Sequence, residues 1–184
     1  GDALYYAGSM QLALGAYAAA AATWRRLIDV EPGSARGYSQ IGALYLCLDE
    51  GAPLRPDSAN VYFRRAHEIN KEETGPVLHL GESALVRGDA ATASRHFGTV
   101  LATHATSAPA HFYLGYLALK RGDDAGAARE FAQAQAHPVA AAVAGATNEG
   151  DTKGGTPMRT RLLHCDALRQ LAEERVPGEA REAM

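Results

Sequence analysis

Four glycines recur at nearly constant spacing, and this spacing limits the possible folds more than any other feature of the chain. Gly8, Gly42, Gly81 and Gly115 follow one another at spacings of 34, 39 and 34. A fixed period of this length is the mark of repeat architectures, in which each unit buries its apolar face against its neighbours. The spacing therefore predicts an array of stacked units and leaves little room for a buried catalytic pocket.

Other residues of each unit keep the same register. Two further sets, one of bulky aromatics and one of alanines, have spacings of 39, 34 and 34: Trp24, Phe63, Phe97 and Phe131, and Ala20, Ala59, Ala93 and Ala127. Five extra residues in the second unit, around 51–56, account for the single irregular spacing. A glycine inside a helix costs about 1 kcal/mol relative to alanine. Four glycines at one register therefore predict a close approach of two helices, with an aromatic side chain filling the space.

Each unit carries two apolar stripes of helical period, separated by a glycine break. In the third unit, Gly88 can adopt the left-handed conformation that ends a first helix, and Asp89 can cap the second. Gly122 and Asp123 repeat this pair in the fourth unit. The predicted helix pairs are 2–14 with 17–30, 36–48 with 57–70, 75–87 with 90–103, and 108–121 with 124–136.

Over about residues 2–138, this pattern resembles the tetratricopeptide repeat family. The resemblance implies an all-α fold, a right-handed α-solenoid of four helix-turn-helix pairs. The repeats are expected at about 1–34, 35–73, 74–107 and 108–138. It also implies a non-enzymatic adaptor or assembly module that binds a peptide or partner domain in a concave groove. The alternative is a regulatory or structural segment of a larger enzyme, or of a secretion or envelope assembly.

The periodicity stops after residue 138. Residues 139–157 are expected to form a turn-rich linker, 158–176 a last helix, and 177–184 a frayed tail. The last helix would place Leu162, Cys165, Leu168 and Leu171 near one face, which predicts a cap on the fourth unit. The length of the linker leaves two alternatives open, in which this helix reaches the groove or joins two copies as a homodimer.

The first helix of each pair is expected to line the groove, with residues half a turn from its packed side pointing outward. Aromatic residues with a polar tip are typical binding anchors. Packing of these aromatics against neighbouring helices is the alternative. The two-carboxylate clamp by which some family members hold acidic chaperone tails is absent, which favours an aromatic, aliphatic or proline-rich ligand. The predicted groove residues are Tyr5, Tyr6, Ser9, Arg36, Gln40, His79, Glu82, Phe112, Tyr113, Tyr116 and Lys120.

Composition argues against several classes of partner. The net charge is −3 with both signs interspersed, so nothing favours binding to nucleic acid or to an anionic membrane. No apolar run is long enough for membrane insertion. Cys47 and Cys165 are expected to be separate thiols, although a single pairing is possible. Because the sequence begins with Gly1, we expect a fragment or processed product, and a cytoplasmic or periplasmic location stays open.

Motifs that carry chemistry are weak. His79 and Glu82 are three residues apart on one predicted helix, but two ligands are too few for a metal site, and a hydrogen-bonded pair is expected instead. The segment 145–152 superficially resembles a phosphate loop, yet Asp151 stands where a lysine is needed. The sequence therefore predicts no catalytic residue, no metal site and no cofactor.

Overall fold

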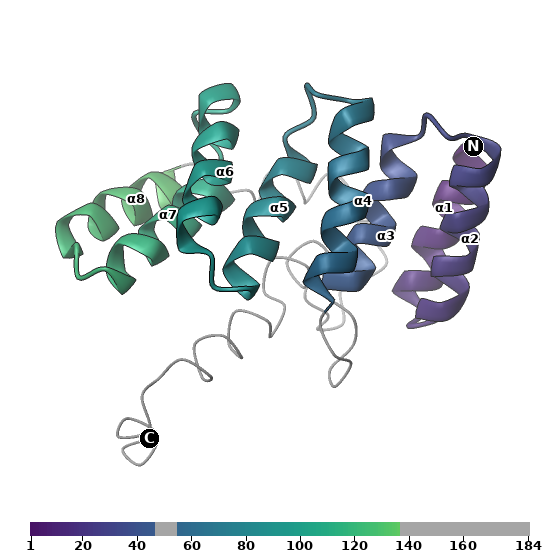
Figure 1. The fold of residues 1–184 in the computed structure, drawn as a ribbon, viewed down its shortest axis with the longest axis horizontal. Coiled ribbons are helices and arrows are strands. Elements are labelled where there is room, and N and C mark those ends of the chain that lie inside the picture. Colours follow the sequence, from purple (N-terminus) through teal and green to yellow (C-terminus); the bar gives the residue numbers. More distant parts are fainter. Residues whose placement is uncertain (47–54, 137–184) are drawn as a thin grey trace, which may run out of the picture.

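The computed structural model describes residues 1–46 and 55–136, and these ranges contain eight α-helices and no strand (Figure 1). The helices are α1 (Asp2–Ala13), α2 (Tyr17–Val30), α3 (Ala35–Leu46), α4 (Pro56–Ile69), α5 (Gly75–Val86), α6 (Ala90–Thr103), α7 (Ala108–Lys120) and α8 (Asp124–Ala136). Where both the predicted and the observed helix end are described, they differ by at most one residue. The all-α prediction is confirmed.

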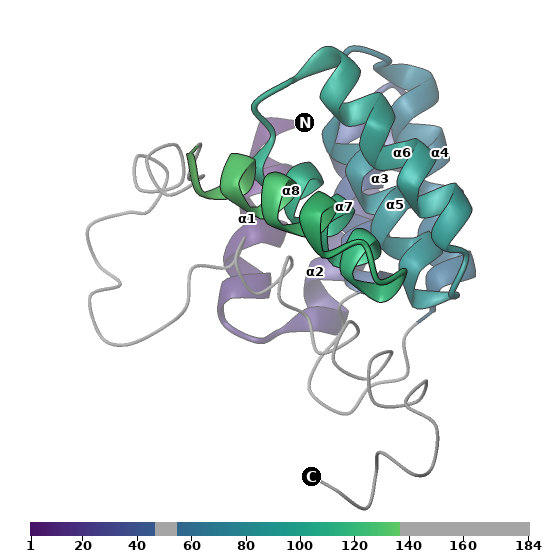
Figure 2. The same ribbon diagram turned by 90° about the vertical axis from the view of Figure 1, so that its left-hand side faces the viewer.

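The helices form four consecutive antiparallel pairs that stack into an α-solenoid. The second helices α2, α4 and α6 each pack against their own partner and against the first helix of the next pair, and α8 packs against its partner α7. The direction of the helices turns along the array, since α1 to α4 stand upright in Figure 1 whereas α7 and α8 lie almost across them. Figure 2 shows the same turn from the side, with α7 and α8 in front.

The turns within the pairs follow the predicted glycine and aspartate pattern. Gly15, Gly88 and Gly122 have φ angles of 74°, 77° and 76°, in the left-handed region that favours glycine. The Asp89 side chain accepts a hydrogen bond from the Thr92 amide, which caps the start of α6. In the fourth pair the Asp123 carboxylate accepts from an amide in the same way.

A glycine and an aromatic residue lock the two helices of each pair together. Trp24, Phe63 and Phe97 are fully buried. A methyl group added at Gly42 would lie 2.7 Å from the nearest Phe63 ring carbon, well inside ordinary contact distance. The predicted close approach is therefore confirmed, and only glycine fits there without moving the ring.

Several predictions concern residues outside the described ranges. These are Cys47 and Cys165, most of the insertion at 51–56, the segment 145–152, the linker 139–157, the capping helix 158–176 and the frayed tail 177–184.

Candidate binding groove

The first helices of the four pairs form one layer of the solenoid, and this layer carries the predicted binding residues. Within the described part of the chain, α3 contacts α5 more extensively than any two second helices contact each other. The closer approach of α3 and α5 indicates that these first helices lie on the inner side of the bend. We call the face formed by α1, α3, α5 and α7 the groove face.

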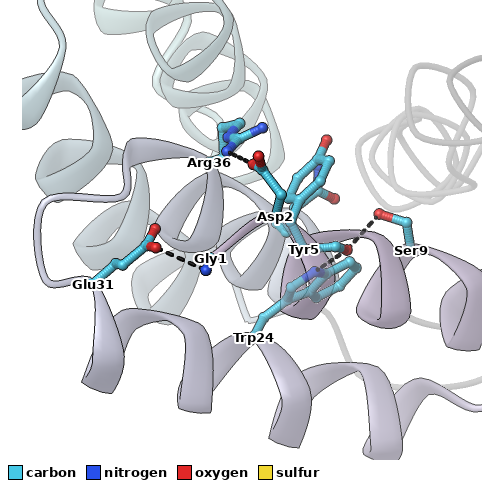
Figure 3. A network of polar contacts seen from close by, with 8 residues as sticks. Gly1, Asp2, Tyr5, Ser9, Trp24, Glu31 and Arg36 are labelled. Carbon is cyan, nitrogen blue, oxygen red and sulfur yellow. Dashed lines mark hydrogen bonds and ion pairs between the residues drawn. The ribbon is translucent and has the colours of Figure 1, made fainter.

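At the N-terminal end, the structure brings four predicted residues together, and Figure 3 shows Tyr5, Ser9 and Arg36 of this group. The Arg36 guanidinium lies over the Tyr5 ring, 4.8 Å from its centroid. The Gln40 amide donates to the Tyr5 hydroxyl at 3.3 Å. Both the Ser9 hydroxyl, at 3.0 Å, and the Trp24 indole N–H, at 3.2 Å, donate to the Tyr5 carbonyl oxygen. Tyr5 is therefore held from several sides, which gives this end of the groove a fixed shape.

Asp2 also belongs to this cluster, although the sequence pattern did not predict it. Its carboxylate lies 2.6 Å from an Arg36 nitrogen. The hydrogen bond and the positive charge of Arg36 hold the Asp2 pKa below its usual range, and Asp2 raises the pKa of Arg36. Asp2 and Arg36 are separated by one repeat period, so they occupy the same position in successive repeats. Opposite charges one period apart were the signal that could have predicted this ion pair.

The middle of the groove face differs from the prediction, because Glu82 and Tyr113 are buried. Glu82 is 4% exposed and Tyr113 is 2% exposed. The Tyr113 hydroxyl donates to Glu82 Oε1 at 2.8 Å, which links α7 to α5. The pKa of the Tyr113 hydroxyl is raised well above its usual range, mainly because the side chain is buried and also because the negative charge of Glu82 lies nearby. Neither side chain lies open to a partner, and both instead join neighbouring repeats.

His79 connects this buried pair to the surface. Its Nδ1 atom lies 2.7 Å from Glu82 Oε2, and its side chain is 22% exposed. Its ring stacks on Phe63, with centroids 4.9 Å apart. The predicted hydrogen-bonded pair of His79 and Glu82 is therefore present, with the carboxylate inside and the imidazole at the groove face.

At the C-terminal end, aromatic side chains remain accessible. Phe112 is 42% exposed, and Tyr116 is partly exposed. The Lys120 ammonium lies 5.6 Å from the centroid of the Tyr116 ring. A cation beside a tyrosine thus occurs at both ends of the groove face, here and at Tyr5.

The last of the predicted residues, Tyr6, lies at the N-terminal end. It is 61% exposed and packs edge-on against Tyr5, with ring centroids 5.4 Å apart.

A second aromatic cluster was not predicted from the sequence. Tyr62 of α4 lies between two tyrosines of α3, with ring centroids 5.5 Å from Tyr45 and 6.4 Å from Tyr38. Arg25 of α2 donates to the Tyr45 hydroxyl at 3.1 Å. These side chains join α2, α3 and α4. Because the tyrosines occur at this register only in the second repeat, the repeat pattern gave no signal for them.

The described residues offer no centre for metal chemistry. No group of three or more His, Cys, Asp or Glu side chains that could hold a metal ion occurs in residues 1–46 and 55–136. Across the same ranges, no helix is long and apolar enough to cross a membrane.

Comparison with known proteins agrees with this architecture. A family model described as tetratricopeptide repeat matches residues 2–34. A thermophilic TPR protein of Thermus thermophilus, TTC0263, has a similar fold with a TM-score of 0.62 and 21% sequence identity. The chain therefore carries a tetratricopeptide repeat at residues 2–34 and has the fold of tetratricopeptide repeat proteins. The TTC0263 match covers 73% of this chain and 72% of the other chain.

Two crystal structures of MamA share the fold of this chain. Both give a TM-score of 0.59 at 16% identity. One match covers 70% of this chain and 68% of the other, and the second covers 96% of each chain. No curated protein sequence matches the chain. At these identities the likeness shows the fold alone. Tetratricopeptide folds are, in general, non-catalytic modules of protein–protein interaction.

Proposed function

We propose that this protein is an adaptor or assembly module that binds an extended segment of a protein partner along the groove face. The observation that supports the proposal is the placement of a cation beside a partly exposed tyrosine at each end of the groove, Arg36 with Tyr5 and Lys120 with Tyr116. An aromatic ring with a polar tip presents a large apolar surface at low entropic cost, which suits it as a binding anchor.

The chemistry of the groove face favours a segment with aromatic, aliphatic or proline side chains. Tyr5, Phe112 and Tyr116 supply apolar surface, whereas the charges of Arg36 and Lys120 lie beside aromatic rings. Aromatic-lined grooves suit proline-rich segments because these are already extended before binding. His79, partly exposed between the two ends, supplies a polar contact that can select among such segments.

A displayed peptide library tests the proposal. Peptides selected on the full chain are titrated by fluorescence anisotropy against the wild type and against Arg36→Ala and Tyr116→Ala. We expect each variant to lose about 1–2 kcal/mol of binding free energy, roughly a 5- to 30-fold rise in Kd. Val61→Ala is the matched control, since Val61 is an exposed apolar residue of α4 and lies off the groove face.

Circular dichroism of each variant separates loss of binding from loss of fold. Selected peptides that bind the double variant Arg36→Ala, Tyr116→Ala as tightly as the wild type would place the binding surface elsewhere and refute the proposal.

A further inference from the structure

The interface between the third and fourth repeats shows how successive repeats of this chain cover one another. Ala110, Tyr113 and Leu117 of α7 pack against an apolar cluster of the third repeat that includes Leu85 and Phe97. Their exposed fractions are 0%, 2% and 4%. The Tyr113 ring stacks on Phe97 with centroids 4.8 Å apart. These three positions of a first helix are therefore the ones that the preceding repeat buries.

In the first repeat, none of the other described residues buries the same three positions. Ala3, Tyr6 and Met10 of α1 occupy the register of Ala110, Tyr113 and Leu117, three repeats earlier. Ala3 is exposed, and Tyr6 and Met10 are 61% and 67% exposed. We call these three residues the head face.

Within the described residues, the fourth repeat exposes apolar side chains on its opposite side. Phe112, Leu119 and Phe131 occupy the register of Leu78, Leu85 and Phe97, one repeat earlier. Leu119 is 53% exposed, whereas Leu85 is 5% exposed. Phe131 is partly exposed, whereas Phe97 is fully buried. We call Phe112, Leu119 and Phe131 the tail face.

We propose that copies of this protein associate head to tail, with the head face of one copy packed on the tail face of the next. The contact continues the interface between the third and fourth repeats, because each face holds the positions that meet there. Tyr6 would stack on Phe131 of the next copy as Tyr113 stacks on Phe97.

A second copy is the one occupant that covers both faces with a single kind of contact. The two faces differ from each other, so the contact is heterologous and leaves one head face and one tail face free in every open chain. Heterologous contacts of this kind build open chains unless the rotation between copies closes a ring. The mass of the assembly is therefore expected to rise continuously with protein concentration.

The test is sedimentation equilibrium of the full chain from low micromolar to several hundred micromolar concentration. Met10→Glu places a charge on the head face, and Leu119→Glu places one on the tail face. Both side chains are mostly exposed in the single copy, so these changes spare its core. Val61→Glu is the matched control, because Val61 is 67% exposed, as Met10 is, and lies on α4 away from both faces.

We expect the wild type and Val61→Glu to associate with rising concentration, and each end variant alone to remain a monomer. A mixture of the two end variants restores one contact, because the first keeps its tail face and the second its head face. That mixture should stop at about twice the monomer mass. The proposal is overturned if the wild type stays monomeric at all concentrations. That is the result expected if residues 158–176 cap the fourth repeat and so cover the tail face. An assembly that persists in both Met10→Glu and Leu119→Glu also overturns the proposal, because a dimer formed through residues 158–176 would persist in this way.

Discussion

The contact between Gly81 and Phe97 allows a quantitative test of how the two helices of a repeat pack. Gly81 lies in α5, and a methyl group built on it would lie 2.8 Å from Cδ1 and 2.9 Å from Cζ of the Phe97 ring. Since carbon atoms are in comfortable contact at about 3.5–4.0 Å, the ring would have to retreat by about 1 Å. Phe97 is fully buried and stacks on Tyr113, so that retreat disturbs the next repeat as well.

Two opposing terms decide the outcome of Gly81→Ala. Alanine is the better helix former by about 1 kcal/mol. Overpacking of a filled core costs about 1–3 kcal/mol. Because the ring is enclosed on all sides, we take the upper part of that range and expect a net loss of about 1–2 kcal/mol. For a chain of this size, that loss lowers Tm by about 2–8 °C.

Gly98→Ala in the same repeat is the control. Gly98 lies within α6, and a methyl group added there meets nothing within 4 Å. Only the helix-forming term remains, so Gly98→Ala should raise stability by about 0.5–1 kcal/mol. Thermal and urea melts followed by circular dichroism measure both variants. If Gly81→Ala stabilises the protein as much as Gly98→Ala does, the glycine is not required by the Phe97 contact and the packing argument is wrong.

Three further predictions follow from buried or paired groups. Ala93 is fully buried, so Ala93→Arg should lower the free energy of unfolding, measured in urea melts, by about 3 kcal/mol or more. Ala91→Arg, at an exposed position of the same helix, should lower it little. Equal stabilities of the two variants would show that the register is misassigned. Tyr113→Phe removes the donor to the buried Glu82 carboxylate and should lower the free energy of unfolding by about 1–3 kcal/mol. Tyr116→Phe is the control and should change it little. A Tyr113→Phe variant as stable as the wild type would contradict the role given to this hydrogen bond. The Asp2 carboxylate should titrate in NMR below the usual range of aspartate and return to that range in Arg36→Gln; because its pKa is lowered on folding, the stability it adds is present near neutral pH and is lost as the pH falls through the lowered value.

The repeat register determined most of the fold that could be predicted. A helix break at Gly88 and a cap at Asp89 are local properties of the chain, so the sequence alone indicates them. The contact of Gly42 with Phe63 follows from the register too, because each period pairs one glycine with one aromatic residue.

The candidate groove could be predicted less completely, and the errors have one cause. The prediction assumed that residues half a turn from the packed stripe of a first helix point to solvent. A first helix such as α5 contacts its own partner α6 and also α3 and α4 of the repeat before it. Through Glu82 it also contacts Tyr113 of the repeat after it. The buried arc is therefore wider than one stripe, and it takes in Glu82 and Tyr113. Their hydrogen bond joins residues of different repeats, whose separation in space depends on how the repeats stack.

The lock between glycine and aromatic residue lies within a single repeat, as Gly42 with Phe63 and Gly81 with Phe97 show. Each repeat thus contains the contact that fixes the angle between its own two helices. A gene segment that encodes one repeat can be duplicated or lost without separating any glycine from the aromatic residue that it contacts. The number of units is then free to change over evolutionary time, whereas the stacking surfaces between units must continue to match.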